Sequence, residues 1–171
     1  MCDKNIKNLY RDLIPIAKEA GAATILDSHG PEFALGLESV PYMVKPNVAE
    51  TEELFGYSLE TDDAKWQAIA QFHAKGIELV ALSLGERGAF VSRGEDKFQV
   101  VPPKIDEVNP VGSGDALVAG FAIGLLEDMP LRDMAILGCA AGAANAMSWA
   151  IGHFTKEQVE RLTDHVEVRE I

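Results

Sequence analysis

The sequence predicts an α/β fold with a mostly parallel sheet, helices on both of its faces and a β-hairpin. Segments with helical spacing of apolar residues alternate with short apolar runs that are typical of strands. The run from Ile77 to Gly85 is almost continuously apolar, as expected for a strand buried inside a parallel sheet. Residues 88–94 and 96–103 form two further runs around a polar turn, and they predict the hairpin.

The expected helices begin and end at recognisable signals. In the first, Leu9, Leu13 and Ile16 recur at helical spacing, and Gly21 follows as a stop signal. A short helix is expected to end at Gly56. The next should carry Trp66, Ile69, Ala70 and His73 on one face and end before Gly76. Three more helices are expected over residues 113–127, 132–151 and 156–163.

The remaining extended segments are short. Strands are expected over residues 23–29, around residues 41–46 and over the last residues, 166–171. The chain opens with a helix, whereas a doubly wound domain usually begins with a strand. We therefore expect a fold truncated at its N-terminal side.

The length and composition indicate one globular domain. With 171 residues, the chain is predicted to form a single α/β domain over residues 1–171. Its apolar stretches are shorter than the roughly 20 residues of a membrane span. No apolar signal core opens the chain. Only Cys2 and Cys139 occur, which excludes a disulfide framework. These features predict a cytoplasmic protein without a membrane partner.

The net charge limits the class of partner. There are 27 acidic and 15 basic residues, a formal charge of −12, which argues against a nucleic-acid partner. This charge does not exclude an anionic small ligand, but the binding site must then compensate the negative charge of the ligand locally. Backbone N–H groups, a helix N-terminus, a lysine or a divalent metal could do this.

The most informative segment is Asn109-Pro110-Val111-Gly112-Ser113-Gly114-Asp115, which precedes an apolar helix. Gly112 and Gly114 let the backbone approach a ligand closely, and the helix directs N–H groups at the same point. Asp115 could accept a proton from an alcohol while those amides hold charge on a transferred phosphoryl group. The alternative is purely structural, with Ser113 as an N-cap and Asp115 as an acid that stabilises the helix dipole.

The segment NPVGSGDALVAGF resembles the C-terminal signature of the ribokinase-like carbohydrate kinases, the phosphofructokinase B family. This resemblance implies a three-layer ribokinase-like fold and an ATP-dependent kinase activity. It assigns the anion hole to Gly112, Ser113 and Gly114, and the catalytic base to Asp115.

A second segment, Lys45-Pro46-Asn47-Val48-Ala49-Glu50, resembles the Asn-x-x-Glu motif of the same family. Asn47 and Glu50 have the spacing of a helix-capping pair, which is the alternative explanation. The resemblance implies that Asn47 and Glu50 lie near Mg²⁺ and that Lys45 and Asn47 contact ATP phosphates.

Two further segments are expected to bind the nucleotide. The resemblance places Ser83, Gly85 and Gly88 of a Ser-x-Gly-x-x-Gly segment along ATP, at the end of a buried strand. The alternative is a tight turn into the hairpin. Asn145 lies in a small-residue stretch that resembles the family's adenine-pocket helix, although a simple core helix is equally compatible.

Other candidates are weaker. The four histidines are dispersed without metal-ligand spacing. Asp27 follows an expected strand and could line the substrate side.

Within the family, residues 26–30 and 44–56 most closely resemble the branch of 1-phosphofructokinases and tagatose-6-phosphate kinases.

The resemblance implies a kinase acting on a hydroxyl of a sugar phosphate such as fructose-1-phosphate or tagatose-6-phosphate. The family's N-terminal sugar-binding part and β-lid have no counterpart in this sequence. The alternative is a non-catalytic nucleotide-binding fragment. A sheet edge left open by the truncation predicts self-association.

Overall fold

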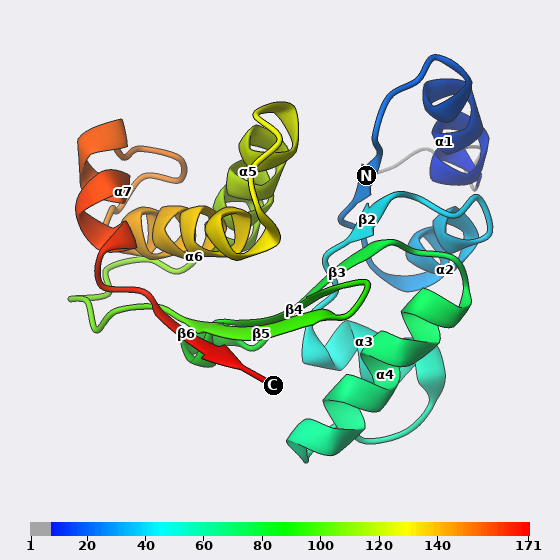
Figure 1. The fold of residues 1–171 in the computed structure, drawn as a ribbon, viewed down its shortest axis with the longest axis horizontal. Coiled ribbons are helices and arrows are strands. Elements are labelled where there is room, and N and C mark those ends of the chain that lie inside the picture. The colour runs from blue at the N-terminus through cyan, green and yellow to red at the C-terminus, as the bar shows by residue number, and fades with distance from the viewer. Residues whose placement is uncertain (1–7) are drawn as a thin grey trace. The chain divides into compact units, whose positions relative to one another are not determined.

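The computed structural model describes residues 8–171, so Cys2 lies outside the described residues. They contain seven α-helices, one 3-10 helix and six strands (Figure 1). The chain divides into two compact units, Met1–Leu82 and Ser83–Ile171. Within residues 8–171, no helix is both long and apolar enough to cross a bilayer. That residues 1–171 form a single domain stays a prediction.

The first unit combines four helices with short parallel strands. In chain order its elements are α1 (Leu9–Glu19), β1 (Ile25–Leu26), α2 (Gly30–Leu37), β2 (Met43–Val44), α3 (Val48–Phe55), α4 (Asp62–Ala74) and β3 (Leu79–Ser83). β1 pairs with β2 and β2 pairs with β3, both in parallel. Met43 aligns with Ile25 on one side and with Leu79 on the other. Phe33, Met43 and Phe72 are among the fully buried side chains.

Two expectations for this unit are corrected, and one helix was not expected. The strand expected over residues 23–29 is only two residues long, because its partner β2 is equally short and the chain enters α2 at Gly30. α2 itself was not predicted, although Pro31 stands at a favourable position in its first turn. The buried face of α4 is rotated from the expected one. It carries Ile69 and Phe72, whereas Ala70 is exposed.

The second unit pairs antiparallel strands with three helices. Its elements are η1 (Gly85–Arg87), β4 (Ala89–Arg93), β5 (Asp96–Val101), α5 (Ser113–Leu126), α6 (Leu131–Ala146), α7 (Lys156–Thr163) and β6 (Glu167–Glu170). The predicted hairpin is confirmed, since Arg93 pairs with Asp96 across its turn. β6 pairs with β5, also antiparallel. The sheet is therefore mixed, with parallel pairing among β1, β2 and β3 and antiparallel pairing among β4, β5 and β6.

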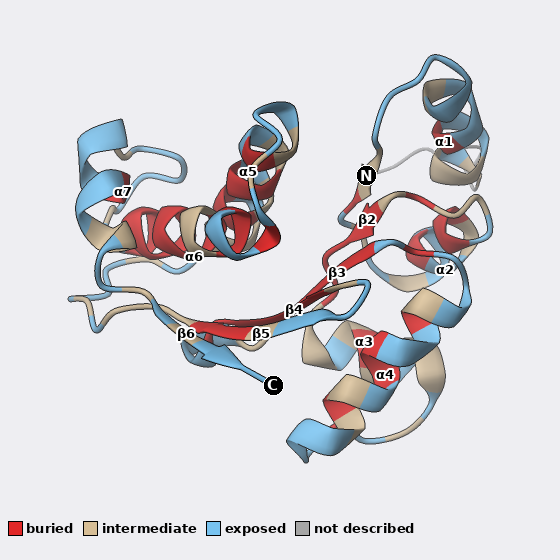
Figure 2. Cartoon of the chain, viewed as in Figure 1, coloured by how far each residue is buried: buried red, intermediate tan, exposed pale blue. Residues whose placement is uncertain are grey.

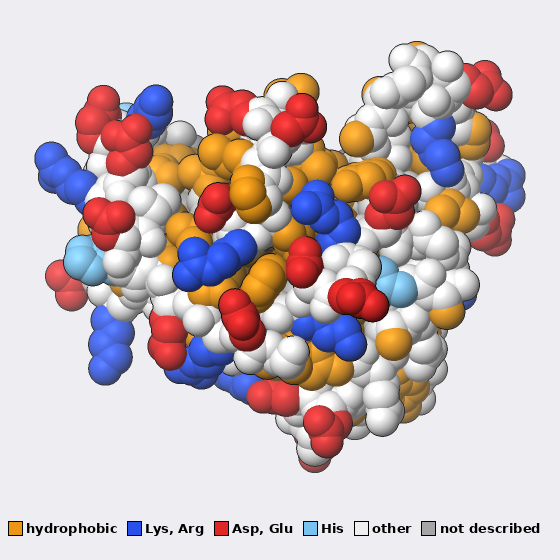
Figure 3. All heavy atoms as spheres, in the orientation of Figure 1, with side chains coloured by type: hydrophobic (Ala, Val, Ile, Leu, Met, Phe, Trp, Pro, Cys, Tyr) orange, Lys and Arg blue, Asp and Glu red, His pale blue; other side chains and the backbone are white. Residues whose placement is uncertain are grey.

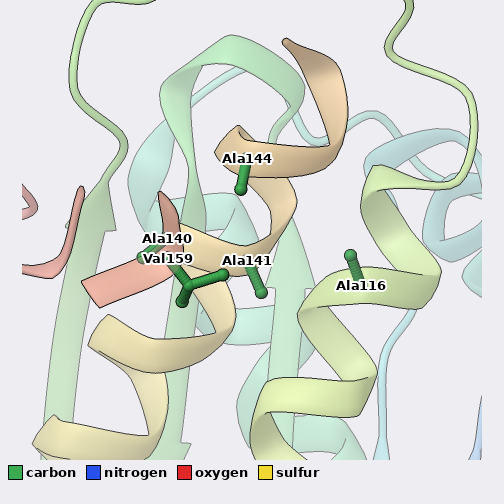
Figure 4. Packing of buried hydrophobic residues seen from close by; sticks show 5 residues of the cluster. All are labelled: Ala116, Ala140, Ala141, Ala144 and Val159. Atoms are coloured by element: carbon green, nitrogen blue, oxygen red, sulfur yellow. The ribbon is translucent and has the colours of Figure 1, made fainter. Parts of the chain in front are cut away.

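Small residues let α5 and α6 approach each other closely. A Cβ atom on Gly120 would collide with the backbone of Gly138, and a Cβ on Gly142 would lie 3.1 Å from the Ser113 carbonyl oxygen. Figure 4 shows Ala116 of α5, Ala140 and Ala144 of α6 and Val159 of α7 in one apolar cluster. Most of α6 is buried (Figure 2). This packing fixes the first turn of α5 against the last turns of α6.

α6 is shorter than expected. It ends at Ala146, and residues 147–152 turn back, with Gly152 at φ 70°. The expected continuation to Ile151 is therefore wrong, and the Gly152 N–H of this turn donates to Asn145 Oδ1 at 2.8 Å. The turn contributes to the site described next.

Candidate active site

The glycine-rich segment forms a tight turn directly before α5. Gly112 is the N-cap residue and adopts φ 84° and ψ −1°, a left-handed conformation that favours glycine. Ser113 is the first helical residue and makes no capping bond with its side chain. The alternative in which Ser113 caps the helix is therefore corrected.

Asn109 fixes the entry to this turn. Its Oδ1 accepts a hydrogen bond from Val111 N–H at 3.1 Å, and its Nδ2 donates to the Trp149 carbonyl at 3.0 Å. The N–H groups of Val108 and Asn109 both donate to the Ala146 carbonyl at the end of α6. No site role was predicted for the Asn109 side chain, although an Asn before Pro is a common turn signal.

Asn145 joins the turn from the other side. Its Nδ2 donates to the Val111 carbonyl at 2.8 Å and lies 3.2 Å from Ser113 Oγ. Its Oδ1 accepts from Gly152 N–H at 2.8 Å. The side chain is only 1% exposed. A residue predicted to contact the nucleotide thus lies buried beneath the glycine-rich turn.

Several N–H groups around Gly112 lack a protein acceptor. The Ser113 N–H donates to the Pro110 carbonyl, and the Ala116 N–H donates to the Gly112 carbonyl. Among residues 8–171, no hydrogen bond uses the N–H groups of Gly112, Gly114 or Asp115. They stand at the positive end of a 14-residue helix, an arrangement suited to an anion.

Asp115 lies in the first turn of α5 and is exposed. No residue of the described chain donates a hydrogen bond to its carboxylate. The carboxylate can therefore accept a proton or a hydrogen bond from a ligand. This geometry fits a general base next to an anion-binding turn.

The Ser83 to Gly88 segment connects β3 to the hairpin. Ser83 is the last residue of β3 and Gly85 is the first of η1. Gly85 has φ 61° and open space where a Cβ would stand, so a ligand can approach its backbone. A Cβ on Gly88 would collide with the Val100 carbonyl oxygen, which explains glycine there by packing alone. Their contact with the nucleotide stays a prediction.

In the first unit, Asn47 and Glu50 form a complete capping box at the start of α3. Asn47 Oδ1 accepts from Glu50 N–H at 2.8 Å, and Glu50 Oε2 accepts from Asn47 N–H at 2.9 Å. The capping explanation is confirmed. It uses one oxygen of each side chain and does not conflict with a ligand on the second carboxylate oxygen of Glu50.

Lys45 and Asp27 follow two paired parallel strands, β2 and β1. Lys45 is 6% exposed, and its Nζ lies 3.3 Å from Asp27 Oδ1. A buried ammonium needs such a partner. The pair places a cation at the carboxyl ends of the strands, where α/β proteins commonly bind ligands.

The described residues show neither a cluster of metal ligands nor, on the face drawn in Figure 3, a concentration of charge of one sign. Within the described part of the chain, no three His, Cys, Asp or Glu side chains gather in a way that could hold a metal ion. Acidic and basic side chains are interspersed on the face drawn in Figure 3. Apart from Ser83, Gly85 and Gly88, the predicted residues form two groups, one in each unit. Gly112, Ser113, Gly114, Asp115 and Asn145 lie together in the second, and Lys45, Asn47 and Glu50 lie close along the chain in the first.

Comparison with known proteins identifies the class. Residues 2–149 match the pfkB family of carbohydrate kinases, and the chain belongs to this family. The ribokinase-like α/β fold predicted from the sequence is confirmed by solved structures of its relatives.

Three relatives illustrate the match. The tagatose-6-phosphate kinase of Staphylococcus epidermidis is 36% identical over 165 residues, which cover 95% of this chain and 53% of the relative. A structure of the tetrameric inhibited form of Escherichia coli phosphofructokinase-2 gives a TM-score of 0.84 at 27% identity, over 93% of this chain and 51% of that one. Arabidopsis thaliana ribokinase complexed with ribose and ATP gives 0.82 at 25% identity, over 92% and 52%. The chain thus spans about half the length of these relatives.

Proposed function

We propose that this chain is the nucleotide-binding and catalytic-base part of an ATP-dependent sugar-phosphate kinase. The observation that carries the proposal is the exposed Asp115 carboxylate beside the unbonded N–H groups of the Gly112 turn. Membership in a family of carbohydrate kinases supports the same reaction class. The cytoplasm is the proposed location.

The turn and Asp115 would have separate roles in phosphoryl transfer. Asp115 accepts the proton of the sugar hydroxyl while that oxygen forms a bond to the γ-phosphorus of ATP. The bond from this phosphorus to the ADP oxygen breaks at the same centre. N–H groups of Gly112 and Gly114 stabilise the negative charge on the transferred group. Ser113 lies between these two glycines, and its N–H donates to the Pro110 carbonyl while its Oγ accepts from Asn145 Nδ2.

Mg²⁺ is the metal proposed for this reaction, and the capping residues fit it. Mg²⁺ prefers carboxylate and water oxygens and retains several of its waters when bound. Glu50 keeps one carboxylate oxygen outside the capping box, and Asn47 holds that carboxylate in place. The metal would neutralise phosphate charge. Lys45, Asn47, Ser83, Gly85 and Gly88 are the proposed contacts of ATP.

The proposed second substrate is a ketohexose phosphate, either tagatose-6-phosphate or fructose-1-phosphate. The relative named tagatose-6-phosphate kinase supports this choice. A chain that binds nucleotide without transferring phosphate would instead be a non-catalytic module. A coupled assay with ATP and each sugar phosphate distinguishes the two.

We expect this chain alone to bind Mg-ATP or Mg-ADP weakly, because the nucleotide motifs are present in a chain of about half the relatives' length. Isothermal titration at millimolar nucleotide should give a saturating isotherm. The same titration without Mg²⁺ should give weaker binding, since phosphate charge would then be less well compensated. Absence of binding at millimolar concentrations would contradict the proposal.

We also propose that the chain self-associates through α1 and the β1 edge. Leu9, Leu13 and Ile16, the apolar stripe predicted for the first helix, are 41%, 49% and 62% exposed. In the described residues, β1 pairs only with β2, so one side of this strand is open. Because β1 has two residues, the helix stripe offers more contact area than the edge. A second copy of the chain is the proposed occupant.

Ile16→Glu should shift the protein towards monomer, because it places a charge within the apolar stripe. Sedimentation velocity over a wide concentration range measures the effect. Leu126→Glu, at an 85% exposed position on α5, is the control and should leave association unchanged. A parent chain that stays monomeric, with slow amide exchange over residues 23–29, would show that the edge is covered internally and would contradict the proposal.

A further inference from the structure

Asn145 bonds both the glycine-rich turn and the turn after α6 through one buried side chain. Its two N–H groups face two acceptors, the Val111 carbonyl at 2.8 Å and Ser113 Oγ at 3.2 Å. Its Oδ1 faces a donor, Gly152 N–H, at 2.8 Å. A reversed amide would set oxygen against the Val111 carbonyl, so the partners define its orientation.

Because the Asn145 side chain is buried, a ligand cannot contact it without displacing one of its partners. The residue is 1% exposed, and both of its donor hydrogens are used within the protein. A nucleotide could bind this amide only by displacing a bond to the turn. A buried amide with all these partners satisfied fixes the groups around it strongly.

The backbone held by Asn145 is the one that carries the anion-binding N–H groups. Val111 precedes Gly112, and Ser113 follows it. Asn145 therefore binds on both sides of the left-handed residue. On its other side, Asn145 fixes Gly152 next to Ile151, whose Cγ2 lies against Gly112. The Asn145 side chain thus fixes the position of the turn and of Ile151, which packs on it.

We propose that Asn145 is a positioning residue that holds the Gly112 turn in its anion-binding geometry, rather than a contact of the adenine. This inference rests on the proposed function for its effect on nucleotide binding, but its effect on the turn is independent of any ligand. Loss of the amide should allow Gly112 and its neighbours to rotate their N–H groups away from a common point. Misdirected donors bind an anion poorly.

The test compares Asn145→Leu, which has similar size without hydrogen bonds, with Asn145→Gln, which keeps the amide. In the full chain, Asn145→Leu should weaken Mg-ADP binding by about tenfold or more, given the loss of three buried hydrogen bonds. Asn145→Gln should fall between this variant and the parent. Thermal unfolding checks that each variant is folded.

Amide exchange without nucleotide supplies the second readout. The N–H groups of Val111 and Ser113 bond to Asn109 and Pro110, not to Asn145. Faster exchange of both in Asn145→Leu would therefore report loosening of the turn itself.

Cys139→Ala is the matched control, because Cys139 is buried on the same helix. Burial raises the pKa of the Cys139 thiol to about 12, so the group is a neutral packing residue. This variant should lose some stability and leave both nucleotide affinity and Ser113 exchange unchanged.

Unchanged exchange at Val111 and Ser113 in Asn145→Leu would overturn the inference. Unchanged Mg-ADP affinity in that variant would overturn it too. If the parent chain binds no nucleotide, the proposed function fails, while the exchange measurement still decides whether Asn145 orders the turn.

Discussion

Replacing Gly112 with valine is expected to abolish Mg-nucleotide binding by this chain. Gly112 has φ 84°, a conformation that a β-branched residue adopts only with strain. A Cβ at this position would also collide with Ile151 Cγ2 and stand 3.6 Å from the Asn145 amide. The turn must therefore rearrange, and its N–H groups lose their common direction. Isothermal titration with Mg-ADP measures the loss.

The control for backbone strain alone is Gly94→Val in the hairpin turn. Gly94 has φ 62°, and no atom lies within 4 Å of the position that a Cβ would take there. This variant should cost stability but keep the nucleotide affinity of the parent. Gly112→Ala, with a smaller side chain, serves if Gly112→Val does not fold, and it should still weaken binding. Parent-like affinity in a folded Gly112→Val protein would show that the turn does not hold the nucleotide.

Local signals in the sequence predicted much of the fold and the position of the turn. The boundaries of α3 and α7 follow from capping residues and apolar spacing, which act within a few residues, and α5 begins directly after the left-handed Gly112. The β4–β5 hairpin follows from its turn residues in the same way. The resemblance of NPVGSGDALVAGF to the family signature predicted Asp115 as the catalytic base.

Longer-range contacts could not be predicted from these signals. The Asn145 side chain bonds Val111, 34 residues earlier in the chain, and this pairing depends on how closely α5 and α6 pack. The two-residue length of β1 is set by its short partner β2 rather than by its own apolar run. The burial of Lys45 likewise depends on Asp27, which lies on a different strand end. Such contacts become visible only once the elements are assembled.

The capping box at Asn47 shows how a structural and a functional explanation can hold for the same residues. The bonds between Asn47 and Glu50 account for their spacing without any ligand. They also orient the Glu50 carboxylate at a helix N-terminus, where phosphate charge is favoured. The bonds explain the position of both residues, and a metal-binding experiment tests the second role.

Asp115→Asn is expected to reduce phosphoryl transfer on the order of 10² to 10⁴-fold in an active form of the protein, the usual contribution of a general base. The variant keeps the shape of the side chain and removes its capacity to accept the proton of the sugar hydroxyl. Nucleotide affinity should change little, since the N–H groups rather than the carboxylate are the proposed phosphate contacts. Steady-state kinetics with tagatose-6-phosphate, together with titration of Mg-ADP, separates the two effects.

Asp133→Asn is a closely matched control. Asp133 is the third residue of α6, as Asp115 is of α5, and both are exposed acids in a first helical turn. Each change should remove a similar favourable interaction with its helix dipole, worth roughly 0.3–1 kcal/mol. If Asp115 only stabilises the dipole of α5, both variants will lose a little stability and keep their turnover. A base role requires that turnover collapses in Asp115→Asn alone, and near-full turnover in this variant would remove Asp115 from the mechanism.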